Sequence, residues 1–279
     1  MDGQWHRPPQ DWRPPAAKPR SGCRLATLPG PAEYSRDPDK GGEVTGMSAS
    51  GEYVVGNAGR DDVLWHDGRY RSLASIPGLN HPEDVNSAGV VVGTELGTGD
   101  DRPWMYDDGE LTYLRVPELG RHELVAVSAI NDDGHILGAV AFDDGIEQKD
   151  LEPLVWHVDS PGEYATPDVE SGPHWKATES TRWPVFDRDA DETGGTVLDQ
   201  ARAADGGGRV YGIKGDMPAM ADGEEVTELP AIAPRPSDAS LQVGLATEVS
   251  RDGEVVAGTS TDSGGTAFPV TWTCRPPSR

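Results

Sequence analysis

Two short segments place a histidine close to a glutamate just before a predicted strand. PGLNHPED contains His81 and Glu83, and LGRHELV contains Arg121, His122 and Glu123. An imidazole and a carboxylate held together at low dielectric have pKa values shifted toward the range that proton transfer requires. We therefore take the two His–Glu pairs as catalytic candidates and Arg121 as a ligand-binding candidate. The alternative is that these polar residues cap strand ends and face water.

A second candidate group lies in the segment 168–196. His174 is a third acid–base candidate there. The candidates for ligand binding are Trp175, Arg182 and Trp183. Indole rings offer flat apolar surfaces to a ring-bearing or sugar ligand, although burial in a loop core is their commoner use.

The same segment contains Asp187, Asp189 and Asp191 at alternate positions, as in a tight calcium-binding loop. Such a loop requires Gly at its sixth place and a bidentate Glu at its twelfth, and Glu192 and Leu198 stand there instead. A solvated acidic loop is the alternative. Calcium is the one ion that the sequence suggests, and we otherwise expect no cofactor.

Several motifs of cofactor and hydrolase chemistry are absent from the sequence. It contains no P-loop, no G-x-G-x-x-G after a strand, no H-E-x-x-H, no G-x-S-x-G and no C-x-x-C. The chemistry that remains needs only a shaped pocket with a few His and carboxylate groups. Sugar hydrolysis by paired carboxylates is one case, and cofactor-free cyclisation, isomerisation or elimination is another.

The charge balance excludes further classes of function. The chain has 24 basic and 48 acidic residues, which gives a formal net charge of -24. A nucleic-acid binder needs a basic face, so we expect no nucleic-acid partner. No apolar run approaches the roughly 18 residues of a membrane span, and the first thirty residues lack a signal sequence. We expect a cytoplasmic protein if Met1 is the true start, and a secreted one if a signal peptide is missing.

The elements that position these residues are repeats. Each repeat has an apolar strand, a glycine turn, a second strand ending in Gly, a loop, and in most copies a third strand with a tryptophan. The clear copies span 44–56, 83–93, 127–138 and 247–258, and a weaker copy spans 201–212. Tryptophans stand in four of the third strands, at Trp65, Trp104, Trp156 and Trp272.

The spacing of the repeats predicts a β-propeller. The turn glycines Gly51, Gly89, Gly134, Gly207 and Gly253 are separated by 38, 45, 73 and 46 residues. Three of these intervals match a four-stranded blade of about 40 to 50 residues. One unit cannot bury both faces of its sheet, so neighbours must stack around an axis. We predict an all-β fold with five four-stranded blades. We interpret the extra residues of the 73-residue interval, the segment 168–196, as a lid over the channel or as the remains of a sixth blade.

The repeat cores resemble a known family. VNSAGVVVG and AINDDGHILG, together with a downstream W-x-D-G, are similar to the HAF repeat, a WD40-like, propeller-forming repeat often found in bacterial extracellular proteins. The resemblance implies the architecture and no particular chemistry. The sequence departs from the family in its degenerate fourth unit and in lacking an export signal.

The two ends of the predicted ring complement each other. The last unit has no fourth strand after Cys274, whereas CRLATLP, from Cys23, resembles the fourth strand of the first unit. Pairing the N-terminal strand with the last blade would remove both unpaired edges. It would also bring Cys23 and Cys274 within disulfide distance. In a reducing cytoplasm two free thiols are the alternative.

We expect one propeller domain over residues 23–275, between a disordered proline-rich tail at 1–22 and a short tail at 276–279. Trp5 and Trp12 in the first tail either dock on a partner or cover the domain's own surface. In a propeller with long loops on one face, those loops surround the channel and form the usual binding site.

The predicted function is therefore binding of a small molecule, glycan or protein on the long-loop face. The alternative is a cofactor-independent cyclase, isomerase, lyase or glycoside hydrolase of bacterial secondary metabolism.

Overall fold

The fold is all-β, as predicted. A computed structural model describes the chain over residues 5–7, 22–31, 34, 41–73, 76, 80–96, 101–117, 122–142, 151–166, 198–233 and 242–274. The named elements within these ranges are nineteen β-strands. They form five antiparallel sheets. No helix among the described residues is long and apolar enough to cross a membrane.

The first three sheets follow one another along the chain. The first sheet contains β2 (Gly42–Met47), β3 (Tyr53–Ala58), β4 (Asp61–His66) and β5 (Arg69–Ser72). The second contains β6 (Pro82–Val85), β7 (Val91–Glu95), β8 (Arg102–Asp107) and β9 (Glu110–Tyr113). The third has three named strands instead of the predicted four: β10 (His122–Ile130), β11 (His135–Phe142) and β12 (Leu151–His157). An isolated bridge from Val155 to Ala165 marks the place of a fourth strand.

The remaining two sheets contain the C-terminal half and the first strand of the chain. The fourth sheet contains β13 (Gln200–Ala204), β14 (Val210–Lys214), β15 (Met217–Asp222) and β16 (Glu225–Glu228). The fifth contains β17 (Gly244–Val249), β18 (Val255–Thr261), β19 (Ala267–Cys274) and β1 (Cys23–Thr27).

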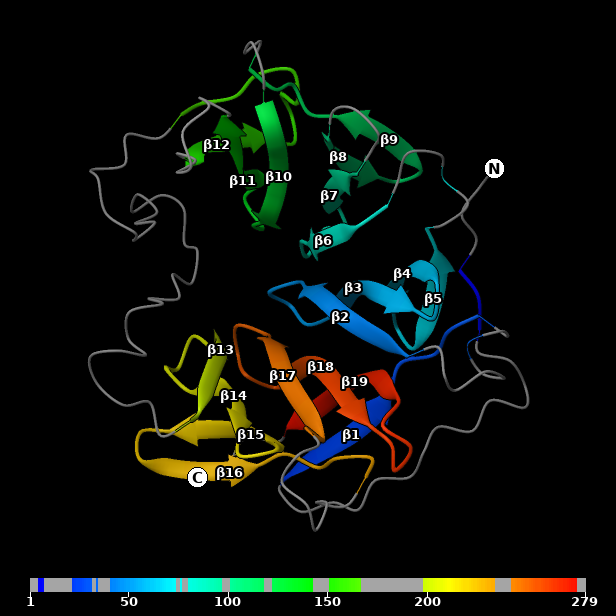
Figure 1. Cartoon of the computed structure of the whole chain (residues 1–279), viewed down its shortest axis with the longest axis vertical. Helices are drawn as coiled ribbons and strands as arrows, with labels where there is room; N and C mark the ends of the chain where they lie inside the picture. Colours follow the sequence, from blue (N-terminus) through cyan, green and yellow to red (C-terminus); the bar gives the residue numbers. More distant parts are fainter. Residues whose placement is uncertain are drawn as a thin grey trace.

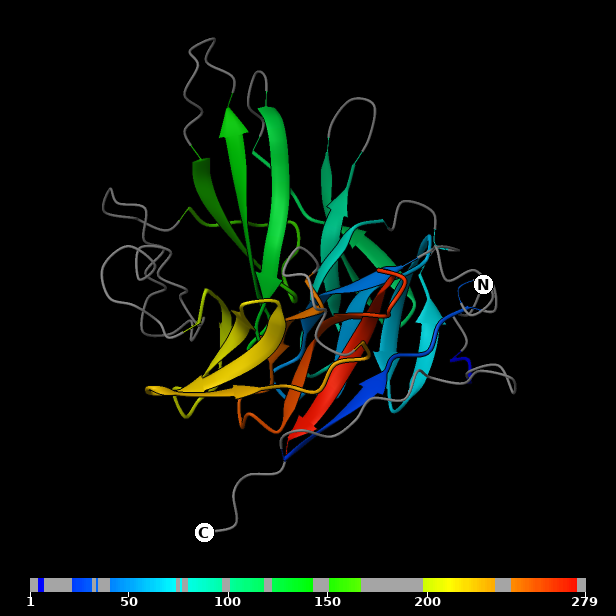
Figure 2. The same ribbon diagram turned by 60° about the horizontal axis from the view of Figure 1, so that its bottom comes forward.

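The five sheets are arranged around a common centre, with β2, β6, β10, β13 and β17 nearest to it (Figure 1). Figure 2 shows the same sheets from a second direction. The second sheet packs against the first and the third, and the fifth packs against the fourth and the first. No comparable packing joins the third and fourth sheets within the described ranges. Residues 167–197, which connect these two sheets in the chain, lie outside those ranges.

The four predicted third-strand tryptophans are completely buried between strands. A buried indole N–H needs an acceptor, and each one donates to a main-chain carbonyl in the segment preceding the innermost strand of its own sheet. The acceptors are the carbonyls of Pro29, Asn80, Arg115 and Pro230. Each sheet with a tryptophan is thereby fastened to its own incoming linker.

A turn with glycine in the left-handed region joins the first two strands of each sheet. In the fourth sheet this residue is Gly208, with φ of 86°, so the prediction of Gly207 was wrong by one position. The error came from the run of three glycines, in which composition does not define the turn. A side-chain oxygen at the start of every turn accepts a hydrogen bond from a main-chain N–H at the end of that turn. The accepting side chains are those of Ser48, Asn86, Asn131, Asp205 and Ser250.

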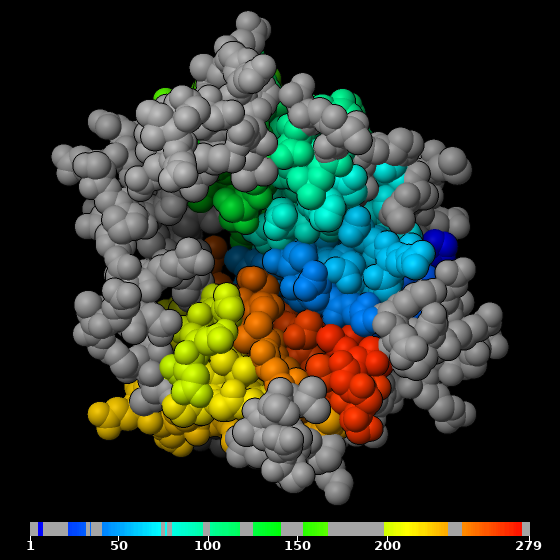
Figure 3. Space-filling view, viewed as in Figure 1, coloured from blue at the N-terminus to red at the C-terminus, as the bar shows by residue number. Residues whose placement is uncertain are grey.

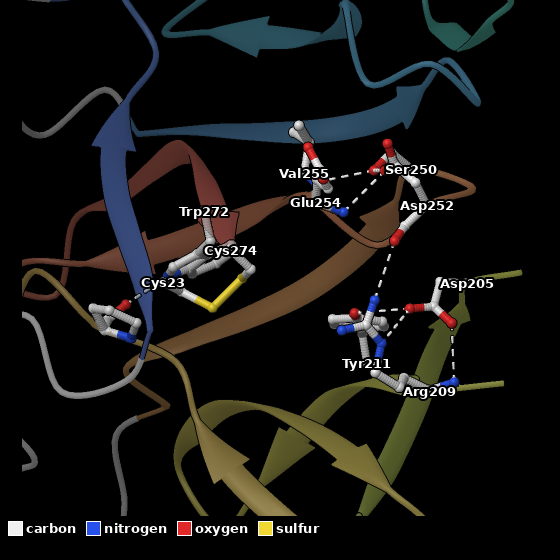
Figure 4. Close-up of a disulfide and its surroundings, with 11 residues drawn as sticks. Cys23, Asp205, Arg209, Tyr211, Ser250, Asp252, Glu254, Val255, Trp272 and Cys274 are labelled. Atoms are coloured by element: carbon white, nitrogen blue, oxygen red, sulfur yellow. Dashed lines mark hydrogen bonds and ion pairs between the residues drawn. A yellow bond between two sulfur atoms is a disulfide. The ribbon is translucent and has the colours of Figure 1, made fainter. Parts of the chain in front are cut away.

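The N-terminal strand belongs to the fifth sheet. β1 pairs antiparallel with β19 from Cys23 opposite Cys274 to Thr27 opposite Val270. Cys23 and Cys274 form a disulfide between these neighbouring strands (Figure 4). The bond joins residues 251 positions apart, so it connects the beginning of the described fold to its end.

A buried ion pair links the fourth and fifth sheets (Figure 4). The Asp205 side chain is fully buried and accepts hydrogen bonds from Arg209 Nε at 2.6 Å and from the Tyr211 hydroxyl at 3.1 Å. Arg209 also donates to the carbonyl of Asp252, in the first turn of the fifth sheet. This network replaces the simpler Ser and Asn turns of the other sheets.

Part of the predicted tail lies on the first sheet. Trp5 contacts the ring of His66, so it covers the domain's own surface, which was one of its two alternatives. Trp12 and the predicted tail at 276–279 lie outside the described residues.

We predict that replacing both cysteines by serine lowers the free energy of unfolding by about 2 to 5 kcal/mol, because the cross-link restricts the unfolded chain. Urea denaturation with and without reductant measures this loss. Reductant should destabilise the wild type to the level of the double variant and leave the variant unchanged. Equal stability of the oxidised wild type and the variant would contradict the prediction.

We also predict that Asp205→Ala costs about 3 to 5 kcal/mol, because it leaves a partly buried guanidinium and two turn N–H groups without their acceptor. Tyr211→Phe removes one hydrogen bond and should cost about 1 kcal/mol. Urea denaturation of the two variants tests this order. A loss for Asp205→Ala no larger than that for Tyr211→Phe would show that the network carries little stability.

Candidate functional site

The innermost strand of every sheet contains a β-bulge at the same place. The register of pairing shifts at Thr45, Glu83, Ser128, Arg202 and Thr247. A bulge changes the direction of the side chains beside it. The residues that follow the bulges are Gly46, Asp84, Ala129, Ala203 and Glu248. Three of these are small, and the two others are acidic.

Asp84 extends from the second sheet to the third. Its Oδ1 accepts a hydrogen bond from the N–H of Val85 at 2.8 Å, and its Oδ2 accepts one from the N–H of Ile130 in β10 at 2.9 Å. The carboxylate therefore satisfies a main-chain group of the neighbouring innermost strand. This contact holds β6 and β10 side by side near the centre of the ring.

Gly46 leaves room for Asp84 on the other side. A β-carbon at Gly46 would lie 2.6 Å from the Cα of Asp84 and 2.7 Å from its Oδ1. Contacts that short are not tolerated, so β2 and β6 can approach this closely only with glycine at position 46.

Glu248, in the fifth sheet, interacts electrostatically with Asp84. Burial is the main cause that raises the pKa of Glu248 well above its usual range, and the charge of Asp84 raises it further. Burial also raises the pKa of Asp84 to about 7, against the opposing effect of its two N–H donors. Because the donors favour the ionised form of Asp84, we expect Asp84 to ionise first while Glu248 keeps its proton. One carboxylate and one carboxylic acid can then accept and donate protons at the same place.

In Figure 3 the surface is hollowed between the first, third and fifth sheets, where their innermost strands approach one another. Arg251 and Asp132 lie at the tight-turn end of the innermost strands, with Arg251 Nη2 3.7 Å from Asp132 Oδ2. This ion pair connects the fifth sheet to the third. We refer to Asp84, Glu248 and Gly46 as the central carboxyl site.

The structure brings together one of the two predicted His–Glu pairs. Glu83 is half-buried, and burial raises its pKa while the nearby His81 lowers it. Asp62 of the first sheet is affected in the same way and also accepts a hydrogen bond from the His81 backbone. His81 is exposed and Glu43 adds a further negative charge beside Glu83. These four residues form an acidic group at the linker end of β6, next to the central carboxyl site.

The remaining predicted site residues receive no structural description. His122 and Glu123 begin β10, but their side chains lie outside the described part of the structure. The other candidates outside it are Arg121, His174, Trp175, Arg182, Trp183, Asp187, Asp189 and Asp191. The calcium loop therefore stays a prediction. Among the described residues, no group of three or more His, Cys, Asp or Glu side chains could hold a metal ion.

Asp84 and Glu248 are not among the site residues predicted from the sequence. The signal was available in the repeat alignment, because EDV and TEV occupy the positions where other units have TGM, SAI and RAA. An acidic residue at a position that is otherwise Gly or Ala departs from the repeat pattern. Histidines, the usual acid–base residues, stand in the loops before the strands, so a search for His–carboxylate pairs leads to those loops and away from this position.

Comparisons with known proteins support the fold and do not establish a family. No family model matches the chain, and no curated protein matches its sequence. Among solved structures, the chain is similar to a gluconolactonase from Xanthomonas campestris, described as important in glucose secondary metabolic pathways. The identity is 14%, the TM-score is 0.50, and the match covers 99% of this chain and 98% of that chain. This gluconolactonase is a β-propeller, so the likeness supports a propeller-like fold here.

A second solved structure is TolB from Acinetobacter baumannii. Its identity is 10% and its TM-score is 0.34, over 82% of this chain and 53% of that chain. A likeness this weak carries no argument about the fold or the function of this protein.

We predict that the wild type loses stability as the pH rises, because Glu248 must ionise in a buried place, and that Glu248→Gln does not show this loss. A carboxyl group whose pKa is higher in the folded state stabilises the fold below its unfolded pKa, near 4.5, and this contribution is lost as the pH rises toward the folded pKa. Gln resembles the protonated acid, so the variant should equal the wild type at pH 4 and become more stable than it at pH 8. Urea denaturation across this range measures the difference.

The exposed Glu52 provides the control, since Glu52→Gln should follow the wild type at every pH. If Glu248→Gln also follows the wild type between pH 4 and pH 8, the carboxyl group at position 248 does not titrate abnormally.

Proposed function

We propose that this protein is a propeller that binds a small polar molecule in the hollow at the centre of its ring, against Asp84 and Glu248. The observation that carries the proposal is the electrostatic interaction between two carboxyl groups, Glu248 of the fifth sheet and Asp84 of the second, where Asp84 lies directly against Gly46. Carboxyl groups of unequal acidity can both accept and donate hydrogen bonds, which suits a ligand rich in hydroxyl or amine groups. His81 and Glu83 would lie on its path of entry.

The proposed ring has five blades and is closed by β1. The pairing of β1 with β19 and the packing of four successive sheet junctions support closure. Six blades remain the alternative at the junction between the third and fourth sheets, which residues 167–197 connect. The relation to the HAF repeat is likewise proposed on the sequence of the turns alone.

A second candidate function is a cofactor-independent enzyme that uses the same site for acid–base chemistry. The observation in its favour is the raised pKa of Asp84, about 7, beside a second carboxyl group that keeps its proton. General acid–base catalysis is most efficient when the pKa lies near the working pH. The gluconolactonase similarity shows that a fold of this kind is compatible with an enzyme, although it assigns no substrate to this chain.

A thermal-shift screen of lactones, sugars, polyols, amines and calcium tests the proposal. We expect at least one compound to raise the Tm of the wild type and of Glu52→Gln but not of Glu248→Gln. A ligand at 100 times its Kd contributes about 2.7 kcal/mol to stability, which such a screen resolves. Compounds that stabilise Glu248→Gln as much as the wild type would place the binding site elsewhere.

The same compounds distinguish a binding protein from an enzyme. Each compound that binds is incubated with the wild type and analysed for chemical change. Turnover by the wild type that is lost in Glu248→Gln would favour the enzyme, and recovery of the intact compound would favour the binding protein.

A further inference from the structure

Residues 5–7 of the predicted N-terminal tail pair with the outer edge of the first sheet through an isolated bridge. The N–H of His6 donates to the carbonyl of Tyr70 in β5 at 2.6 Å, and the N–H of Tyr70 donates to the carbonyl of His6 at 3.0 Å. These bonds form an antiparallel bridge. Figure 1 shows the short dark blue segment next to β5. We refer to residues 5–7 as the N-terminal strap.

The strap places the Trp5 side chain between His66 and Arg71 of the first sheet. The ring of Trp5 packs on the ring of His66, with centroids 5.6 Å apart. The His66 ring stacks on Tyr53 at 4.2 Å and nearly parallel, so the surface under Trp5 is itself an ordered pair of rings. On its other side Trp5 is covered by the guanidinium of Arg71, 4.8 Å from the ring centroid.

Arg71 shows that this place favours an aromatic ring. Its Nε is buried and has no hydrogen-bond partner among the described residues. A guanidinium that lacks such a partner gains most from the face of an aromatic ring, and tryptophan is the ring that attracts a cation best. The recess between Arg71 and His66 is therefore suited to an indole.

The edge below the recess is β5, the outer strand of the first sheet, and the main-chain groups of Tyr70 in it are bonded to the strap. Outer strands of sheets are templates for strand addition, in which main-chain hydrogen bonds give affinity and alternate side chains give specificity. The outer strands β9 and β16 carry no such bridge within the described ranges, whereas β5, already the fourth strand of its sheet, does.

We propose that the outer edge of β5 is a binding site for an extended peptide with an aromatic side chain, and that the N-terminal strap occupies this site within its own chain. The strap is held by two main-chain hydrogen bonds, by the Trp5 indole and by the His6 ring, whose centroid lies 5.4 Å from that of Tyr70. Its covalent link to the domain raises its effective concentration at the edge and so favours it over a free peptide. A free peptide binds the edge when the strap is weakened. No residue of the central carboxyl site takes part, so this proposal is independent of the proposed function.

The test uses a fluorescently labelled peptide with the sequence of residues 1–10, MDGQWHRPPQ, and the full-length protein. Its binding is measured by anisotropy to the wild type, to Trp5→Ala and to Trp12→Ala. Trp12 is a second tryptophan of the same tail, so its variant is the matched control. We expect Trp5→Ala to bind the peptide about tenfold or more tightly than the wild type or Trp12→Ala, because its own strap has lost the indole.

Two further measurements locate the bound peptide. A peptide in which Trp5 is replaced by Ala should bind the Trp5→Ala protein at least about tenfold more weakly, since cation–π contact and ring stacking are lost. Adding Arg71→Ala to the Trp5→Ala protein should weaken binding of the unmodified peptide. Thermal unfolding curves establish that each variant is folded before binding is measured.

Two results would overturn the proposal. One is a folded Trp5→Ala protein that does not bind the peptide, because the edge would then have no affinity of its own. The other is equal binding by the wild type and Trp5→Ala, because the strap would then not occupy the site that the peptide uses.

Discussion

The antiparallel pairing of β1 with β19 is the contact on which the arrangement of the sheets depends. It joins the start of the described fold to its end, and the disulfide between Cys23 and Cys274 makes the joint covalent. Without this strand the fifth sheet would have an open edge at β19. The fifth sheet also packs on both the fourth and the first, so its completion supports two of its neighbours.

The central carboxyl site follows from the repeat itself. Each innermost strand has a bulge at one position, and the residue that follows it belongs to the strand of its sheet nearest to the common centre of the five sheets. Most units place a small residue there, while the second and fifth units place Asp84 and Glu248. A regular scaffold thus acquires a chemically distinct centre through two substitutions, and burial changes the acidity of both groups.

Much of the fold could be predicted from the sequence, because the repeat combines strand alternation with glycine turns. The position of Cys23 opposite Cys274 followed from aligning the two incomplete ends. The central carboxyl site could not be predicted in the same way. The contact from Asp84 to the N–H of Ile130 depends on how neighbouring sheets approach, and the pKa of Glu248 depends on burial, neither of which local pattern determines. The pairing of the strap with β5 could not be predicted either, because the proline-rich composition of residues 1–22 favours a disordered tail and a single Trp does not reveal which surface it covers.

The hydrogen bonds from the buried indoles to the linkers allow the sequence of the linkers to vary, because they involve only main-chain oxygens. Trp104 and Trp156 hold the carbonyls of Asn80 and Arg115, and every amino acid offers that same oxygen. These indole hydrogen bonds therefore do not depend on which amino acid occupies the linker position. Side chains in these linkers can therefore change and acquire new binding chemistry, while the indole hydrogen bonds still hold the linker main chain to its sheet.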